Sequence, residues 1–172
     1  QLCEVDPMAA KEAIRDFSHF LRANMSSLTN KSPIPFAQEL THVKHYLNLE
    51  KQRFQERLNV VYDIRTENFV IPPLTLQPIV ENAVFHGIEP CVDNGILRIC
   101  VTLTGASLLV SVSDNGVGME AGRVKAINER LGRVEDTEEP PEKQRGGIAL
   151  INVNRRSKLL FGETYGLCVY SM

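Results

Sequence analysis

The sequence predicts an α+β fold: a two-layer α/β sandwich with helices on one face of a mixed sheet, preceded by a helical hairpin. Near the N-terminus, apolar residues recur at steps of three and four, the spacing of amphipathic helices. After residue 58, β-branched and apolar runs alternate with helical segments. At 172 residues the chain can bury about 70% of its unfolded surface. We therefore expect a hairpin over residues 1–57 and a second domain over residues 58–172.

The hairpin is predicted to contain two helices, separated by Ser32-Pro33-Ile34-Pro35. The apolar stripe of the first helix consists of Ile14, Phe17, Leu21, Met25 and Leu28. That of the second consists of Leu40, Val43, Leu47 and Phe54. The stripes need a partner, which is either the following domain or a second chain that completes a bundle. Of the two we favour self-association, which makes the hairpin a dimerisation region.

The second region is predicted to begin with a strand over 58–64, after which Pro72 and Pro73 open a helix that carries Asn82. Further along we expect a β-hairpin over 96–104 and 107–113, helices over 119–131 and 150–160, and a last strand over 165–170. Residues 135–143 hold five acidic residues and two prolines, which predicts a mobile loop.

The overall charge favours no polyanionic partner. A formal net charge of -2 gives no electrostatic reason to expect nucleic acid or an anionic membrane as a ligand. Cys3, Cys91, Cys100 and Cys168 form no CxxC pair and lie in or beside apolar runs, which predicts reduced, mostly buried thiols and a cytoplasmic location. No apolar run approaches 18 residues and no leader is recognisable, so we expect no spanning or exported segment here. A membrane segment outside this chain stays open.

The helix over 76–87 carries Asn82 and His86, which are four residues apart and therefore share a face. The carbonyl oxygen of Asn82 is the kind of hard neutral ligand that Mg2+ accepts when phosphate oxygens supply most of the charge. His86 is a candidate hydrogen-bond donor to a phosphate. The alternative for each is a polar side chain satisfied within a core.

Asp114 follows the apolar run 109–112, which predicts a carboxylate at the end of a buried strand. A carboxylate there can accept a hydrogen bond from the exocyclic amine of adenine, whereas guanine carries a carbonyl at that position. Gly116 and Gly118 would let the backbone lie against a flat base and turn away. The alternative is that these residues form only a tight turn.

Gly146 and Gly147 precede another predicted helix. The first amides of a helix have no internal partners, so this entry can hold the anionic end of a nucleotide, and Arg145 could supplement it. The alternative is a flexible hinge. Together the three segments predict a site for ATP and Mg2+.

These segments resemble the sensor histidine kinases of the LytS and YesM type. Their ATP-binding half has the Bergerat-type fold of the gyrase, Hsp90 and MutL ATPases. The matching segments are Leu21-Arg22 ("LR" element), residues 39–54 (second helix), Ile71-Pro72-Pro73 with 76–87 (asparagine box), 114–119 (first glycine box) and 147–153 (second glycine box).

The resemblance implies the ATP-binding catalytic portion of a two-component kinase, which presents the γ-phosphoryl group of ATP to a histidine. That histidine is expected outside this chain, since the family "NPHFLFN" segment is absent and Ser18-His19-Phe20-Leu21 mimics only part of it. No catalytic residue is therefore assigned within the chain. The implied partners are ATP or ADP, the protein's own phosphoacceptor helix, a response regulator and a second copy, in a full-length protein anchored in the plasma membrane.

The chain departs from the family pattern at three places, and two other functions stay open. Relatives often have lysine where this chain has Phe85 and glycine where it has Ala149, and the chain stops before a final "GT" strand. The first two departures favour a nucleotide-binding pseudokinase or interaction module. A gyrase-like ATPase is the other alternative. It would need a glutamate base one turn before Asn82, where the sequence has Pro78, while Glu81 is adjacent to Asn82.

Overall fold

The computed structural model describes residues 7–29, 32–105, 107–133 and 148–171. The chain forms two compact units, residues 1–117 and residues 118–172, each of which is described by itself. The predicted division at residue 57, between a dimerisation hairpin and an ATP-binding domain, is a division by function and stays a prediction.

The first unit is organised around a three-stranded sheet in the order β2-β4-β5. Its strands are β2 (Leu58–Ile64), β4 (Gly95–Thr104) and β5 (Ser107–Asp114). β2 runs parallel to β4, and β4 runs antiparallel to β5, so the sheet is mixed, as predicted. A short two-stranded ladder, β1 (Ile34–Pro35) with β3 (Val70–Ile71), joins the chain before α3 to the chain before α4.

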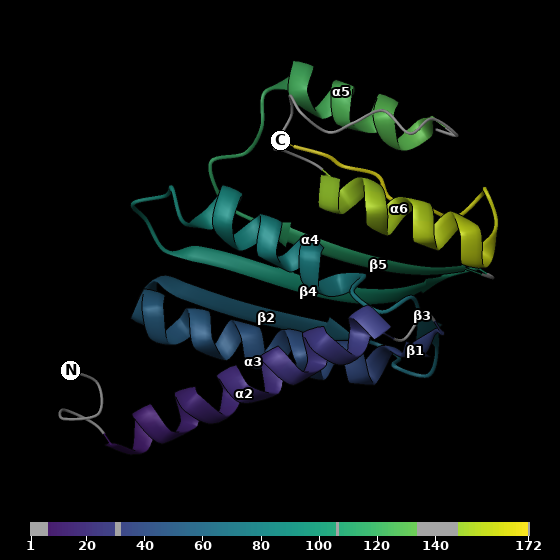
Figure 1. Ribbon diagram of the computed structural model, residues 1–172. Helices are drawn as coiled ribbons and strands as arrows, with labels where there is room; N and C mark the ends of the chain where they lie inside the picture. The colour runs from purple at the N-terminus through teal and green to yellow at the C-terminus, as the bar shows by residue number, and fades with distance from the viewer. Residues whose placement is uncertain (1–6, 30–31, 106, 134–147, 172) are drawn as a thin grey trace. The chain divides into compact units, whose positions relative to one another are not determined.

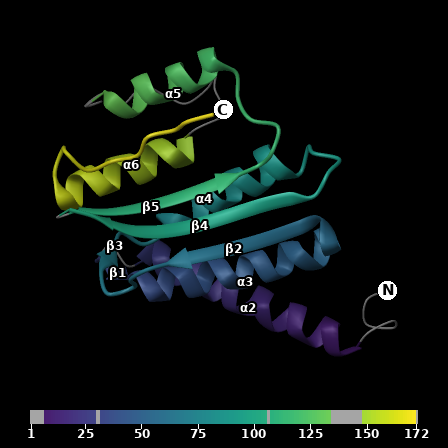
Figure 2. The ribbon, with the colours of Figure 1, turned by 180° about the vertical axis from the view of Figure 1, so that it is seen from behind.

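The helices of this unit are α2 (Pro7–Thr29), α3 (Phe36–Phe54) and α4 (Leu76–Asn82). A 3-10 turn, η1 (Gln55–Arg57), follows α3, and the π-helix η2 (Ala83–Ile88) continues α4. In Figure 1, α3 and α4 lie in front of the strands, and in Figure 2, seen from behind, the strands lie in front of both helices. The predicted two-layer arrangement is confirmed.

One hydrophobic core fills the space between this helical layer and the sheet. It consists of Phe36, Leu40, Val43, Leu47, Phe54, Leu58, Ile71, Leu76, Val80, Val84, Ile88, Leu97, Ile99 and Val101. The stripe predicted on the second hairpin helix is thus part of the core. The stripe of α2 is not: Ile14, Phe17, Leu21 and Met25 are 44–69% exposed, although α2 packs against α3. The side chain of Leu28, the last member of the predicted stripe, lies outside the described residues.

The second unit contains α5 (Ala121–Gly132), α6 (Ile148–Phe161) and the residues that follow them. The helices predicted over 119–131 and 150–160 are thus confirmed. In Figures 1 and 2 the chain after α6 turns back and runs alongside that helix.

The predicted last strand, residues 165–170, is wrong, because this segment has no strand partner among the residues that the structure describes. Two asparagines take the place of a partner. Asn154 Oδ1 accepts a hydrogen bond from Leu167 N at 2.8 Å. The Asn128 amide donates to Val169 O at 2.7 Å and accepts from Val169 N at 2.9 Å. Side chains of α5 and α6 thus satisfy backbone groups that a neighbouring strand would otherwise bind.

Two other expectations need correction. The helix that carries Asn82 begins at Leu76, so Pro72 and Pro73 lie before its first turn rather than in it. The thiols described are free but not buried, since Cys91 and Cys100 are half-buried and Cys168 is exposed. The expected loop over 135–143 lies outside the described residues. Within the described ranges, no helix is both long enough and apolar enough to cross a membrane.

Candidate nucleotide-binding site

The register of the sheet places Asp114 on the helix-covered face. Asp114 is the last residue of β5 and lies directly opposite Leu97, a fully buried member of the core. Side chains that are directly opposite in an antiparallel pair share a face. Unlike Leu97, Asp114 is exposed. The expectation that β5 is a buried strand is wrong, because its residues are exposed or half-buried. Asp114 Oδ1 accepts a hydrogen bond from Gly116 N at 2.9 Å, and within the described ranges this is the only hydrogen bond of the carboxylate.

Gly87 packs directly against the turn that follows β5. A Cβ atom added to Gly87 would lie 2.3 Å from Asp114 Oδ1, and one added to Gly116 would lie 2.2 Å from the carbonyl oxygen of Gly87. The same carbonyl accepts a hydrogen bond from Val117 N at 3.1 Å. Gly116 is therefore required by contact with the backbone of Gly87, and Gly87 by contact with the Asp114 carboxylate. This is a structural reason for Gly116, and its predicted contact with a base stays a prediction.

Asn82 is the last residue of α4 and is half-buried. Its Nδ2 donates a hydrogen bond to Pro78 O at 2.6 Å. A backbone carbonyl can only accept, so the amide orientation is fixed by chemistry and Oδ1 is the end that faces away. Within the described residues Oδ1 has no hydrogen-bond partner, which leaves an acceptor oxygen suited to a metal ion or a donor.

The helix widens immediately after Asn82. Residues 83–88 form a π-helix, in which Glu89 N donates to Val84 O at 2.8 Å, a five-residue step. Such segments are rare and frequently occur at functional sites. His86 lies in this segment and is exposed, and its ring makes an edge contact with Phe85 at 4.9 Å between centroids. Asn82, His86 and Gly87 thus belong to one continuous helical element whose end packs against the Asp114 turn.

The start of α4 is held by a buried glutamate of α3. Glu39 is 1% exposed, and its carboxylate accepts hydrogen bonds from Leu74 N, Leu76 N and Gln77 N at 3.2, 3.2 and 3.4 Å. Burial raises the pKa of Glu39, and the backbone hydrogen bonds oppose this rise by stabilising the carboxylate.

Glu81, the acidic neighbour of Asn82, accepts a hydrogen bond from Gln77 Nε2 at 2.8 Å. One turn before Asn82, where a gyrase-like ATPase would need its base, Pro78 offers only a backbone carbonyl, and that carbonyl is bound to Asn82. The structure therefore gives no support to the ATPase alternative.

The second unit holds the remaining predicted residues. Gly118 has a φ of 67°, in the left-handed region that favours glycine, which is a conformational reason for glycine at this position. Arg145, Gly146 and Gly147 lie outside the described residues, and their predicted role, like that of Gly118 at a base, stays a prediction. Ala149 lies within α6 and its φ is not positive, so alanine causes no backbone strain at this position, where relatives have glycine.

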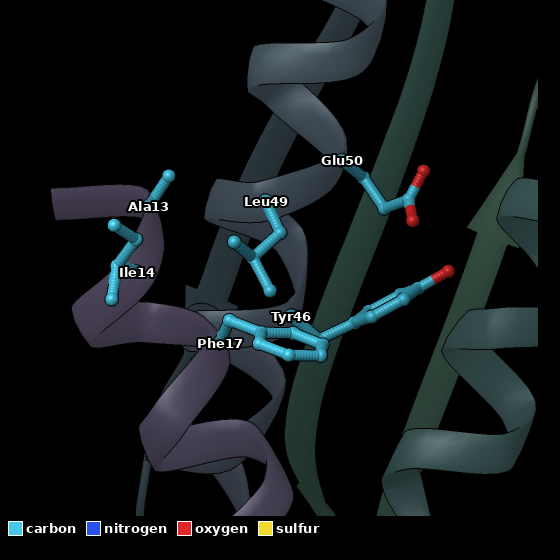
Figure 3. Close-up of a pocket in the computed structure, with 6 residues that line it drawn as sticks. All are labelled: Ala13, Ile14, Phe17, Tyr46, Leu49 and Glu50. Carbon is cyan, nitrogen blue, oxygen red and sulfur yellow. The ribbon is translucent and has the colours of Figure 1, made fainter. Parts of the chain in front are cut away.

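A hollow lies between α2 and α3 in the first unit (Figure 3). It has a volume of about 470 Å³ and is lined by Ala13, Ile14, Phe17, Tyr46, Leu49 and Glu50. Glu50 is its only charged side chain, and the rest of the lining is mostly apolar. Such a groove suits an apolar helix rather than the phosphates of a nucleotide.

Gly87 and Glu39 are the residues of this region that the sequence did not single out. Gly87 has a recognisable signal, since a glycine inside an apolar helical run lowers helix stability and usually has a packing reason. Glu39 has a weaker one, because it stands directly before Leu40 of the buried stripe, at a position where a charged residue is normally expected in solvent.

Two family models match the chain. Residues 72–167 match the family described as histidine kinase-, DNA gyrase B-, and HSP90-like ATPase. Residues 1–58 match the family described as histidine kinase. Among solved structures, the catalytic domain of histidine kinase ThkA is similar at a TM-score of 0.45 and 16% identity, over 74% of this chain and 78% of that one.

Several sensor kinases are similar over most of the chain. Sensor histidine kinase YpdA of Escherichia coli (strain K12) is 39% identical over 92% of this chain and 26% of its own length. Sensor protein LytS of Oceanobacillus iheyensis is 32% identical over 94% of this chain and 27% of its own length. Sensor histidine kinase YesM of Bacillus subtilis (strain 168) is 35% identical over 82% of this chain and 22% of its own length. The chain thus spans roughly a quarter of each relative. Because the match over residues 72–167 covers more than half of the chain, the chain belongs to the histidine kinase-, DNA gyrase B-, and HSP90-like ATPase family, and its relatives are sensor kinases of the predicted LytS and YesM type.

Proposed function

We propose that this chain is the ATP-binding catalytic portion of a sensor histidine kinase. One observation carries the proposal: an exposed carboxylate, Asp114, lies on the helix-covered face at the end of β5, against the helical element that carries Asn82. A hydrogen-bond acceptor for adenine and an oxygen ligand for a phosphate-bound metal are thus presented by two adjoining elements of one unit.

Each residue has a distinct role in this proposal. Asp114 uses its remaining oxygen to accept a hydrogen bond from the exocyclic amine of adenine, which discriminates against guanine. Gly87 and Gly116 keep the floor beside that carboxylate free of side chains. Asn82 Oδ1 ligates Mg2+, which neutralises phosphate charge when bound. His86, exposed on the following turn, donates a hydrogen bond to a phosphate oxygen. From their sequence pattern, Gly118, Gly146 and Gly147 are proposed to contribute backbone groups to nucleotide binding.

The proposed reaction is phosphoryl transfer to a histidine that lies outside this chain. A bond forms between an imidazole nitrogen and the γ-phosphorus, the bond from that phosphorus to the bridging oxygen breaks, and ADP leaves. The imidazole loses its proton to solvent or a base. This chain contributes positioning and charge neutralisation, which are the main sources of catalysis in phosphoryl transfer.

The exposed stripe of α2 supports a homodimer in the full-length protein. Ile14 and Phe17 line the groove between α2 and α3, and they belong to the stripe that the first unit leaves uncovered. A second copy would bury both in a helical bundle. We further propose a response regulator as the acceptor of the phosphoryl group, and a membrane anchor elsewhere in the full-length protein.

Of the two residues that favour the pseudokinase alternative, Phe85 still does so and Ala149 does not. Ala149 is helical and unstrained, so it gives no reason for lost turnover. Phe85 is 59% exposed beside His86, at a position where a lysine would add a cation for phosphate. Nucleotide binding without transfer to an added histidine-bearing segment would favour this alternative.

Calorimetric titration of the purified chain with ATP, ADP and GTP, each with and without magnesium, tests the proposal. We expect ATP and ADP to bind, magnesium to strengthen the binding of ATP, and GTP to bind at least tenfold more weakly. Equal affinities for ATP and GTP would rule out the assigned role of Asp114.

A further inference from the structure

The two helices of the layer over the sheet are joined by a single buried carboxylate. Glu39 lies in the first turn of α3, and its oxygens accept hydrogen bonds from amides at the start of α4. The N-terminal ends of two helices, each carrying a partial positive charge, therefore meet at one negative group. This arrangement gives a physical reason for a charged side chain that is 1% exposed.

The same carboxylate holds a turn that its sequence does not favour. Leu74 has a φ of 55°, in the left-handed region that non-glycine residues seldom adopt. Glu39 Oε2 accepts the Leu74 N–H at 3.2 Å, while Thr75 Oγ1 donates to Pro72 O at 2.6 Å. Unfavourable backbone conformations persist where the surroundings over-determine them, and they occur preferentially at functional sites.

The far end of the same helical element is fastened differently. Arg53 pairs with Glu89, and Arg57 Nη2 donates to Cys91 O, but both arginines are exposed to solvent. Exposed ion pairs contribute little to stability and are screened by salt. Of the polar contacts described here between α3 and the helical element over 76–88, the buried ones are those of Glu39.

We propose that Glu39 is a positioning residue, which fixes the start of α4 on α3 and thereby sets the location of the metal-binding amide of Asn82. This inference rests on the proposed function, because Asn82 matters only if nucleotide and magnesium bind. The path is short, since α4 consists of residues 76–82, with amides of its first two residues bound to Glu39 and Asn82 at its other end. Any displacement of α3 is transmitted to Asn82 through these hydrogen bonds.

Glu39→Gln is the informative variant, because glutamine has nearly the same shape but offers one oxygen and an NH2 group to three N–H donors. Glu56→Gln is the matched control, since Glu56 lies in η1 and is exposed. Two quantities are measured in each protein: hydrogen exchange of the Leu74, Leu76 and Gln77 amides, and the ratio of ATP affinities with and without magnesium. Both are measured well below the melting temperature of the variant.

We expect Glu39→Gln to accelerate exchange of at least one of these amides more than tenfold, with β4 amides unaffected, and to reduce the magnesium ratio at least fivefold. Glu56→Gln should change neither quantity. A purely structural role predicts a lower melting temperature with an unchanged magnesium ratio, and that result overturns the proposal.

Glu39→Asp provides the same test if Glu39→Gln does not fold, because it keeps the charge and draws the oxygens back by one methylene group. A reduced magnesium ratio in Glu39→Asp supports the proposal and an unchanged ratio overturns it. If magnesium does not change the ATP affinity of the unmodified protein, the proposed function itself is contradicted. That result is distinct from a failure of the link between Glu39 and α4.

Discussion

The Asp114 carboxylate occupies the space into which a side chain at Gly87 would project: a Cβ atom there would lie 2.3 Å from Asp114 Oδ1. The end of β5 and the end of the π-helix η2 are therefore in direct contact, and the contact depends on a missing side chain. Glycine at position 87 is thus required by the position of the carboxylate rather than by backbone conformation, since its φ is not positive.

Gly87→Ala should weaken ADP binding about tenfold, because the new methyl group forces Asp114 or the helix end to move, a disturbance of about 1–3 kcal/mol. Calorimetry with ADP measures the effect, and a thermal melt shows how much of it is loss of stability. Gly122→Ala is the control. A Cβ atom at Gly122 would meet nothing within 4 Å, and alanine in α5 should stabilise by about 0.5–1 kcal/mol. Unchanged ADP affinity in Gly87→Ala would contradict the assigned contact.

Asp114→Asn should weaken ATP and ADP binding by about 1.5–3 kcal/mol without unfolding the chain, because the amide keeps the hydrogen bond from Gly116 N but lacks the charge that strengthens a bond from adenine. The ATP-to-GTP preference should shrink in parallel. Asp93→Asn removes the same charge from an exposed loop residue and should leave both affinities unchanged. Equal losses in the two variants would point to a general electrostatic effect instead.

Asn82→Ala should abolish the effect of magnesium on ATP affinity, since it removes the proposed ligand oxygen and leaves the adenine contact in place. It also removes the hydrogen bond to Pro78 O, so a stability loss of about 0.5–1.5 kcal/mol is expected as well. Calorimetry with and without magnesium, beside a melt without nucleotide, separates the two effects. Asn59→Ala, an exposed change on β2, controls for the loss of an amide. Retention of the full magnesium effect would exclude Asn82 as a ligand.

Much of the fold could be predicted because apolar spacing is a local signal. The sheet strands and both hairpin helices have the expected periods, and Asp114 stands at the end of an alternating strand. The prediction of a last strand over 165–170 is wrong because a β-prone sequence does not show whether a neighbouring strand is available. In this segment Asn128 and Asn154 bind the backbone instead. The contact between Gly87 and Asp114 joins residues 27 positions apart, so no local pattern encodes it.

The buried carboxyl group of Glu39 should make the free energy of unfolding fall as the pH rises, whereas a salt-bridged acid makes it increase. Burial raises the pKa of Glu39 in the folded state above its ordinary value, so the folded protein retains the proton over a range in which the unfolded chain has lost it. The contribution of this group to stability is fully present below the ordinary glutamate pKa and is lost as the pH rises through the raised value.

Glu39→Gln removes this titration. The free energy of unfolding of the unmodified protein, minus that of the variant, should therefore fall as the pH rises through this window. Denaturant unfolding of both proteins at a series of pH values measures the difference. A difference that grows with pH would show that the backbone hydrogen bonds outweigh burial and lower the pKa instead.

The isolated chain should bind nucleotide but not phosphorylate itself, because none of its four histidines lies in an NPHFLFN-like segment, where the resembled family carries its acceptor. His42 and His45 lie on α3, where His45 Nδ1 is 2.7 Å from Asp16 Oδ1, and His86 lies within the proposed nucleotide site itself. His19 lies on α2 in a segment that mimics only part of the family motif.

Incubation with radiolabelled ATP, followed by acid and base stability tests of any label, decides this prediction. A base-stable, acid-labile phosphate that is lost in His19→Ala would overturn it and make the Ser18-His19-Phe20-Leu21 segment the acceptor. With no label on the chain, a longer protein that carries an NPHFLFN-like segment should still become labelled when this chain and magnesium are present, because the site supplies the positioned γ-phosphoryl group. Nucleotide binding without that transfer would instead favour the pseudokinase, with Phe85→Lys as the substitution to test for restored turnover.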